Sequence, residues 1–347
     1  FHVHAENSHD SGVLLADRVR SMASEGVEFF SSTDHDYITD YAPVVEDLGL
    51  EEWVRTSPGL ETTTVEIGHF LGFPLAQDFL AEAGGAFDWT ELGPAEILEE
   101  LARTGRQAGY DPLLTVTHPR AGILGYYDQY GFDPYGGVPG VAGERGMPAV
   151  QTPLLALTNP LLKPEFLAWD FHAMEILTGK ELRHVRTPTQ AELDRYAESG
   201  DVETYDILER TLAEQADLDE GIYRLGYGLN GAIDDWFTLL NLGFRYTALG
   251  NSDTHGMTST EAGCPRNFVM AGTDDPAYLD PQEVADAVKE HRVVASFGPF
   301  VQLWVDGASI GSEIVPAGET ITLEVEVQAP TWMDVDRVEL YENGTLI

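Results

Sequence analysis

The feature that most constrains the fold is the alternation of short apolar segments with helical ones, with histidine and acidic residues directly after the apolar segments. Strands are predicted over 1–5, 27–31, 55–64, 67–73, 113–117, 173–177, 246–249 and 293–296. Helices are predicted over 13–24, 43–50, 94–108, 233–242 and 281–291. Strands that alternate with helices favour a parallel α/β barrel, in which chemical groups collect at the carboxyl ends of the strands.

The pattern changes near residue 298 and divides the chain into two parts. Residues 1–297 are expected to form the barrel, with a helical insertion at about 189–225. In 298–347 apolar and polar residues alternate between turn dipeptides such as Asp306-Gly307, which predicts a small antiparallel, sandwich-like β segment, cut short at 347. The Gly-rich and Pro-rich stretch 122–160 has little periodicity and is expected to be a functional loop.

Charge and composition exclude several classes of protein. The chain carries 59 acidic and 19 basic residues, a formal net charge of -40, which disfavours binding to nucleic acid or to an anionic membrane. No apolar stretch approaches the roughly 18 residues of a membrane helix. The acidity favours an extracytoplasmic or high-salt setting. The single cysteine, Cys264, excludes a disulfide framework and a Cys-rich zinc site, and we expect it to be at least half-buried.

The first strand carries two histidines, His2 and His4, whose spacing places both side chains on one face. Such a pair is half of a site for zinc, manganese or iron, although a single His-x-His is more often a surface accident. Asp10 follows six residues after His4 and is either an N-cap carboxylate or a further ligand. Because 1–4 resembles the middle of a strand, we expect further sequence upstream.

Other candidates follow the later strands. In Asp34-His35-Asp36 the histidine is a candidate metal ligand, and either aspartate is a candidate to orient an imidazole. Glu61 lies in an apolar strand, where an unpaired carboxylate is costly, so it is expected to bridge cations. The remaining candidate ligands are His69, His118, Asp253 and His255. A set rich in histidine and carboxylate, without thiolate, suits two or three divalent cations.

Together these motifs resemble the polymerase-and-histidinol-phosphatase (PHP) family over residues 1 to about 297. The motifs are His-Val-His with Asp10, Thr-Asp-His, Glu61, His-Phe-Leu-Gly, Thr-His-Pro and Ser-Asp-Thr-His. Ala-Glu-Asn-Ser-His-Asp-Ser, Gly-Asn-Ser-Asp-Thr-His, Ser-Phe-Gly-Pro and the β tail are similar to the carbamate-hydrolase-like branch, CehA/McbA. The resemblance implies a distorted (β/α)7 barrel with a trinuclear metal site.

The resemblance also implies how the ligands are shared. One cation would be held by His2, His4, Glu61 and Asp253, a second by Glu61, His69 and His118, and a third by Asp10, His35 and His255. His9 is an alternative to Asp10. The expected cofactors are therefore two or three divalent cations per chain, Zn, Mn or Fe.

The expected function is metal-dependent hydrolysis, in which a metal-bound hydroxide attacks a small ester, carbamate or amide. Asp253 or Asp34 is the candidate to move the proton. Arg120 is either a clamp for an anionic group or a surface arginine on a loop, and Glu175 is a candidate at the edge of the site. Two alternatives stay open: a phosphomonoesterase or phosphodiesterase of the same family, and a metal-stabilised binding domain without catalysis. The expected partner is a small-molecule substrate, and the oligomeric state is open.

Overall fold

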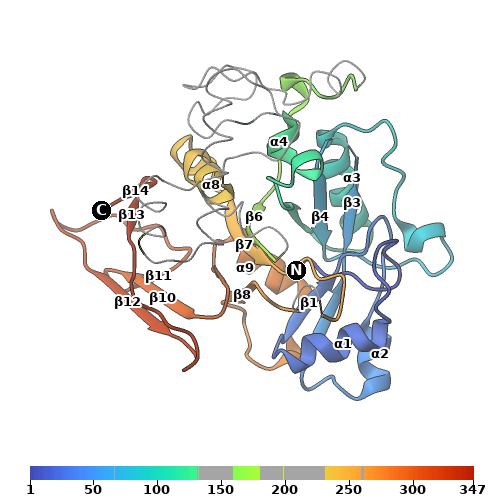
Figure 1. The fold of residues 1–347 in the computed structure, drawn as a ribbon, viewed down its shortest axis with the longest axis horizontal. Helices are drawn as coiled ribbons and strands as arrows, with labels where there is room; N and C mark the ends of the chain where they lie inside the picture. The colour runs from blue at the N-terminus through green and yellow to red at the C-terminus, as the bar shows by residue number, and fades with distance from the viewer. Residues whose placement is uncertain (66, 131, 133–158, 180–197, 199–230, 259–261) are drawn as a thin grey trace.

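The protein has a mixed α/β fold, seen in a computed structural model that describes residues 1–347 except 66, 131, 133–158, 180–197, 199–230 and 259–261. Its central sheet has the order β3-β4-β5-β6-β7 (Figure 1). The strands are β3 Leu60–Thr63, β4 His69–Phe73, β5 Leu113–Val116, β6 Ala173–Thr178 and β7 Thr247–Asn251. β5, β6 and β7 run parallel to one another, whereas β4 is antiparallel to both β3 and β5.

A second, parallel pair joins β1 Phe29–Ser32 to β2 Arg55–Pro58. β2 continues into β3 through Gly59, where a Cβ atom would collide with the Ser31 hydroxyl and the Ser32 carbonyl. Only glycine therefore allows the chain to bend here without moving β1. Because Glu61 follows two residues later, this bend sets where its carboxylate lies.

The N-terminal residues make a second connection between the two sheets. Val3 forms a parallel bridge with Thr254, just after β7, and its carbonyl accepts a hydrogen bond from the backbone N–H of Thr33 at 2.9 Å, just after β1. Strand pairs join β3 through β7 and, separately, β1 to β2, and the contacts of Val3 with Thr254 and Thr33 link these two groups of strands.

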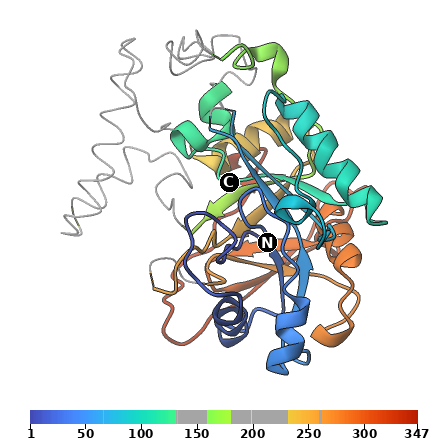
Figure 2. The ribbon, with the colours of Figure 1, turned by 90° about the vertical axis from the view of Figure 1, so that its right-hand side faces the viewer.

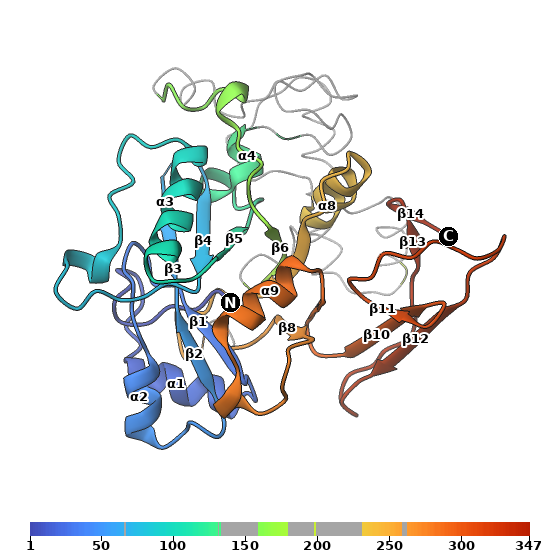
Figure 3. The same ribbon diagram turned by 180° about the vertical axis from the view of Figure 1, so that it is seen from behind.

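Helices cover the outer faces of these strands and bury their apolar sides. The helices are α1 Leu15–Ser24, α2 Ala42–Leu48, α3 Pro94–Gln107, α4 Tyr126–Tyr130, α8 Ala232–Asn241 and α9 Pro281–Lys289. α1 and α2 lie together at the end of the molecule opposite α4, as the view turned by 90° shows (Figure 2). α3 lies along β4, and α9 packs near β5 and β8 (Figure 3). The helices thus leave the strand ends free to carry polar groups.

The C-terminal residues form small antiparallel sheets beside the main body (Figure 1). One has the order β11-β10-β12 and the other pairs β13 with β14. The strands are β10 Phe300–Val305, β11 Ala308–Ser309, β12 Leu323–Gln328, β13 Tyr341–Glu342 and β14 Thr345–Leu346. The antiparallel β segment predicted from the sequence is confirmed, but of its last alternating stretch, 337–341, only Tyr341 belongs to a strand.

Two further expectations about strands need correction. The all-parallel arrangement is wrong, since β4 runs against both of its neighbours. The segment 293–296 was expected to be a barrel strand, yet β9 Val293–Ser296 pairs antiparallel with β8 Arg266–Val269, a strand that the sequence analysis did not predict. The expected helical insertion at 189–225, apart from residue 198, and most of the loop 122–160 lie outside the described residues. Cys264 is half-buried, as predicted.

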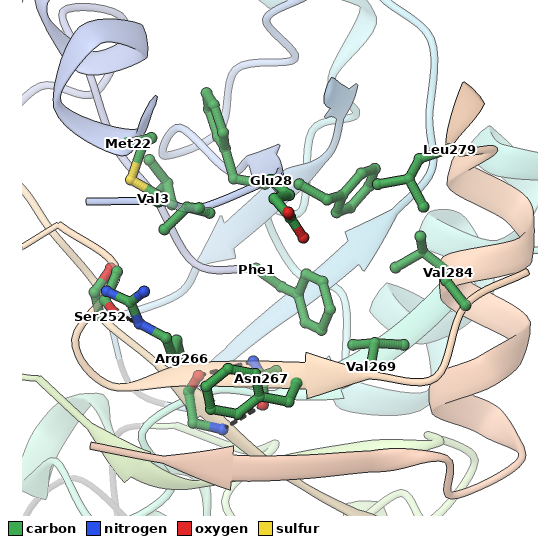
Figure 4. A pocket seen from close by; sticks show the side chains of 18 of the residues that line it. Phe1, Val3, Met22, Glu28, Ser252, Arg266, Asn267, Val269, Leu279 and Val284 are labelled. Carbon is green, nitrogen blue, oxygen red and sulfur yellow. Dashed lines mark hydrogen bonds between the residues drawn. The ribbon is translucent and has the colours of Figure 1, made fainter. Parts of the chain in front are cut away.

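A cavity of about 160 Å³ lies between β1, β8 and α9, next to the N-terminal residue (Figure 4). Its wall is mixed, with apolar side chains such as Phe1, Met22 and Leu279 beside polar ones such as Glu28 and Asn267. None of the nine candidate metal ligands lines it. The polar site therefore has to be sought in the buried side chains at the strand ends.

Candidate metal centre

The N-terminal segment fixes the first two histidines. The backbone N–H of His4 donates to the Thr254 carbonyl at 3.1 Å, and the N–H of Asp253 donates to the His2 carbonyl at 3.0 Å. This extended pairing places both imidazoles on the same side, with ring centroids 4.9 Å apart. Both histidines are completely buried. The structure therefore gives the pair a common, enclosed environment, unlike a surface His-x-His.

Glu61 is the centre of the site. Its fully buried carboxylate lies near five imidazole nitrogens, at 2.8 to 3.4 Å. These belong to His2, His4, His35, His69 and His118. Burial alone would raise the pKa of Glu61, but the positive charge available on the imidazoles outweighs it and holds the pKa well below its usual range. Glu61 is therefore an anion that can be shared between cations.

Asp253 extends the cluster from the end of β7. Its Oδ1 lies 3.4 Å from His2 Nε2, 3.2 Å from His4 Nε2 and 3.2 Å from His255 Nδ1. Its backbone has a φ of 48°, which is unusual outside glycine. Such strain is retained where the surrounding contacts determine the conformation, here the hydrogen bond from its N–H to His2.

Asp10 closes the solvent side of the site. Its two carboxylate oxygens lie 3.3 Å from His35 Nε2 and 3.2 Å from His255 Nε2. The Asp10 side chain is 45% exposed, whereas those of His35 and His255 are 7% and 11% exposed. The ring of His9 lies 5.0 Å from that of His35, so it stays an alternative ligand on the same side. All nine candidate ligands are thus connected by contacts of 3.4 Å or less.

We shall call these nine side chains the ligand cluster. They are His2, His4, Asp10, His35, Glu61, His69, His118, Asp253 and His255. Three groups within it have ligand atoms that all lie within 4.8 Å of one another. The groups are His2, His4 and Asp253; His2, Glu61 and His118; and His4, His35 and His255. This is the separation expected of atoms that can coordinate a common ion.

Buried polar atoms without hydrogen-bond partners test whether cations fit here. Five such atoms lie in the ligand cluster: Nε2 of His2, His4 and His69, Nδ1 of His118, and Oε2 of Glu61. A buried polar atom without a partner costs about 1–3 kcal/mol, so several in one place need an explanation. Divalent cations would satisfy all of them at once, because imidazole nitrogen and carboxylate oxygen are their usual ligands. The residues present therefore fit a metal centre.

The imidazoles of the cluster have unlike pKa values. Burial lowers the pKa of His2, but the carboxylates of Asp253, Glu61 and Glu175 outweigh it and raise the pKa well above the usual range. For His4 the burial dominates and lowers the pKa well below that range. The pKa of His69 is also lowered, by burial. Without a cation the cluster would therefore hold a mixture of charged and neutral imidazoles.

Asp34 does not touch the imidazoles of the cluster directly. Its buried carboxylate accepts hydrogen bonds from Ala5 N–H at 2.8 Å, Ser8 Oγ at 3.0 Å, Thr39 Oγ1 at 2.7 Å and Tyr41 O–H at 3.1 Å. Ser8 Oγ lies 2.9 Å from His4 Nδ1. Asp34 therefore suits orienting His4 through a hydroxyl, one of the two roles that the sequence left open, better than moving a proton.

Arg120 was expected to clamp an anionic group or to lie on the surface, and the structure supports neither. It is fully buried and donates to both carboxylate oxygens of Asp235, to Asp128 Oδ1 at 3.0 Å and to the Phe132 carbonyl at 2.8 Å. These internal partners occupy all three of its guanidinium nitrogens. Arg120 thus ties the loop after His118 to α4 and α8, which is a structural role.

Sequence reasoning missed Arg18, which holds the backbone of the cluster. Its guanidinium donates to the carbonyls of His4 at 2.8 Å, Thr254 at 3.3 Å and Gly256 at 3.4 Å, and it is completely buried. A signal was present in the sequence, because Arg18 is four residues before Met22 on the buried face of α1. An arginine in an apolar stripe needs internal acceptors, and here they are the two ligand-bearing segments.

Comparison with known proteins gives no assignment. No family model matches the chain, and no curated protein matches it. None of the described helices is long and apolar enough to cross a membrane. The function therefore has to be inferred from the ligand cluster and the residues that support it.

Proposed function

We propose that the chain is a metal-dependent hydrolase whose ligand cluster holds two or three divalent cations. The observation that carries this proposal is the fully buried carboxylate of Glu61, surrounded by five imidazoles that come from different parts of the chain. A protein that needed only stability would bury apolar side chains there, because charged groups are expensive to bury. We therefore infer that this cluster of buried ionisable groups serves to bind cations.

The ligands divide into three sets in this proposal. The first is His2, His4, Glu61 and Asp253, the second is Glu61, His69 and His118, and the third is Asp10, His35 and His255. Each close group of ligand atoms overlaps one of these sets: His2, His4 and Asp253 overlap the first, Glu61 and His118 the second, and His35 and His255 the third. Bound there, the cations would lower the pKa of a water molecule to near neutrality and polarise a substrate oxygen.

The protein's own groups then have distinct tasks. Glu61 and Asp253 supply the negative charge that balances the cations. Asp253 is also the better placed of the two aspartates expected to move a proton, since Asp34 is enclosed by four hydrogen-bond donors. Asp10, which is half-exposed, marks the side from which substrate and water reach the cluster.

The preferred substrate class is a small ester, carbamate or amide. Arg18 and Arg120 are the two buried arginines among the described residues, and their guanidinium N–H groups donate hydrogen bonds to internal acceptors. A strongly anionic phosphate substrate would be expected to use such a cation as a clamp. The excess of acidic residues over the whole chain also repels a polyanionic substrate.

The strand pairings support a PHP-type barrel as the fold of this hydrolase. The pairings lead from β3 through β7 and the N-terminal segment to β1 and β2, which is continuous with β3. Counting β2 and β3 as one bent strand, we propose that they form a distorted seven-stranded barrel. The ligand cluster would then lie where several strands end, which is where barrel enzymes carry their chemistry.

The test combines metal analysis with a parallel screen of substrates. The purified chain, loaded with Mn or Zn, is offered 1-naphthyl N-methylcarbamate, p-nitrophenyl acetate, p-nitrophenyl phosphate and bis-p-nitrophenyl phosphate. The Glu61→Gln protein should lose both bound metal and turnover. His291→Gln is the matched control, because the His291 ring contacts the Thr247 hydroxyl and is not part of the ligand cluster. Turnover of the phosphoesters alone would reject the preferred substrate class, and metal binding without any turnover would favour a binding domain.

A further inference from the structure

Glu175 is a buried carboxylate in the central sheet and is not one of the nine candidate ligands. It lies on β6 and is completely buried. Its Oε1 lies 2.8 Å from His2 Nδ1 and accepts a hydrogen bond from Asn251 Nδ2 at 2.8 Å. Its Oε2 accepts from the His118 backbone N–H at 2.9 Å and from Thr178 Oγ1 at 3.3 Å. A carboxylate with this many partners is fixed in position.

The contact with Glu175 decides which nitrogen of His2 carries a proton. An ionised carboxylate only accepts hydrogen bonds, so Nδ1 of His2 must be the donor. When a cation displaces the other ring proton, the lone pair that His2 offers is therefore on Nε2. That atom lies 3.2 Å from Glu61 Oε2 and 3.4 Å from Asp253 Oδ1, so it faces the ligand cluster.

The same carboxylate holds a second ligand through the backbone. His118 follows β5 and has a φ of 23°, a conformation that L residues rarely adopt. Its N–H is held by Glu175, and its ring lies 5.6 Å from the ring of His2 in a stacked arrangement. Glu175 thus fixes the orientation of one ligand and the backbone of another.

His4 is oriented differently, which provides an internal comparison. Its Nδ1 lies 2.9 Å from Ser8 Oγ, and that hydroxyl donates to Asp34 Oδ1 at 3.0 Å. A neutral hydroxyl therefore stands between His4 and its carboxylate, whereas His2 meets the carboxylate of Glu175 directly.

We propose that Glu175 is a positioning residue of the metal centre, which fixes the Nδ1–H form of His2 and the backbone of His118 so that both imidazoles bind cations tightly. The inference rests on the proposed function, since it requires that the ligand cluster binds metal. Carboxylates that accept from a ligating histidine strengthen it as a ligand, and their loss costs about 10–100-fold in metal affinity.

The experiment compares Glu175→Gln with Thr247→Val. Thr247 is a buried residue on the neighbouring strand β7 whose hydroxyl donates to the Val288 carbonyl, so Thr247→Val removes a buried hydrogen bond without touching the ligand cluster. Zn²⁺ affinity is measured by competition with a chelator, and Tm is measured with and without Zn²⁺. Glu175→Gln should lose about 10–100-fold in affinity and show a smaller rise in Tm on adding Zn²⁺. Thr247→Val should lower both Tm values equally and keep the rise.

A second measurement needs no substitution at Glu175. In the wild-type protein labelled with ¹⁵N-histidine and loaded with Zn²⁺, the His2 ring should carry its proton on Nδ1, with the signal assigned by its loss in His2→Gln. A proton on Nε2 would overturn the inference, even if Glu175→Gln does not fold. An unchanged Zn²⁺ affinity in Glu175→Gln, or a Tm pattern equal to that of Thr247→Val, would also overturn it. Failure of the wild-type chain to bind any cation would instead reject the proposed function.

Discussion

His35 and His255 face each other with their Nε2 atoms 3.2 Å apart, although 220 positions separate them in the chain. The first follows β1 and the second follows β7, and Asp10 places one carboxylate oxygen beside each of these nitrogens. Two imidazole nitrogens at this distance repel each other unless a proton or a cation lies between them. Asp10 supplies the negative charge that would favour a cation.

Replacing Asp10 by Asn should therefore remove one bound cation and leave the others. The change keeps the size of the side chain but removes its charge, and the deeper ligands around Glu61 are untouched. Metal content after loading and dialysis, measured by mass spectrometry, should fall by one equivalent relative to the wild-type chain. Asp17→Asn is the control, because Asp17 lies on the exposed side of α1, where it pairs with Arg20 at 3.0 Å. Equal metal content in both variants would contradict the assignment of Asp10.

Arg18→Met should destabilise the fold strongly. The substitution leaves the buried His4 carbonyl without the donor that Arg18 provides, and an unsatisfied buried group of this kind costs about 1–3 kcal/mol. It also removes the hydrogen bonds from Arg18 to the carbonyls of Thr254 and Gly256. Urea denaturation of the metal-free protein measures the change in the free energy of unfolding. Arg20→Met on the same helix is the control, with an expected change within about 0.5 kcal/mol because its side chain is more than half exposed. Similar losses in both variants would show that Arg18 does not hold these segments.

Much of the site could be predicted from the sequence because strand ends can be recognised locally. His35, His118 and Asp253 each follow an apolar strand by a few residues, and strands that lie side by side bring such residues together. The partners of Arg120 could not be found in this way. Asp235 is 115 positions away, and nothing in the local pattern around either residue shows that they meet. The antiparallel direction of β4 also depends on long-range pairing, since its residues suit either direction.

The pair of Arg120 and Asp235 leads to a prediction about pH. Burial raises the pKa of Asp235 from 3.8 to about 6, and the neighbouring Arg120 only partly offsets this. The folded protein therefore binds this proton more tightly than the unfolded chain does, and the contribution of Asp235 to stability falls as pH rises from about 4 to about 6. The free energy of unfolding of Asp235→Asn should lack this part of the pH dependence. An unchanged pH profile in the variant would contradict the raised pKa.

The same pair also allows a double-mutant test. Removing one partner of a buried ion pair typically costs about 3–5 kcal/mol, because the other charge stays buried. Asp235→Leu should therefore cost this much, whereas Arg120→Met combined with Asp235→Leu should be more stable than Asp235→Leu alone. Urea denaturation of the two variants and the wild type gives the comparison. A double variant less stable than Asp235→Leu would show that Arg120 stabilises the fold through its other partners, Asp128 and the Phe132 carbonyl.

Bound cations should stabilise the protein more as pH rises. The pKa values of His2, His35 and His118 are raised: burial lowers each, but nearby carboxylates, chiefly Asp253 for His2 and Glu61 for the other two, outweigh it. Each imidazole must lose the proton on its ligating nitrogen before it can bind a cation, so protons compete with metal up to a higher pH than for an ordinary histidine.

In the metal-free protein, these protonated imidazoles contribute stability that is fully present below the unfolded pKa of 6.5. That contribution is lost as pH rises through the raised pKa values of the folded protein. The difference in Tm between Zn²⁺-loaded and chelated protein should therefore increase from about pH 6 to about pH 8, and a constant difference would show that these imidazoles do not bind the cations.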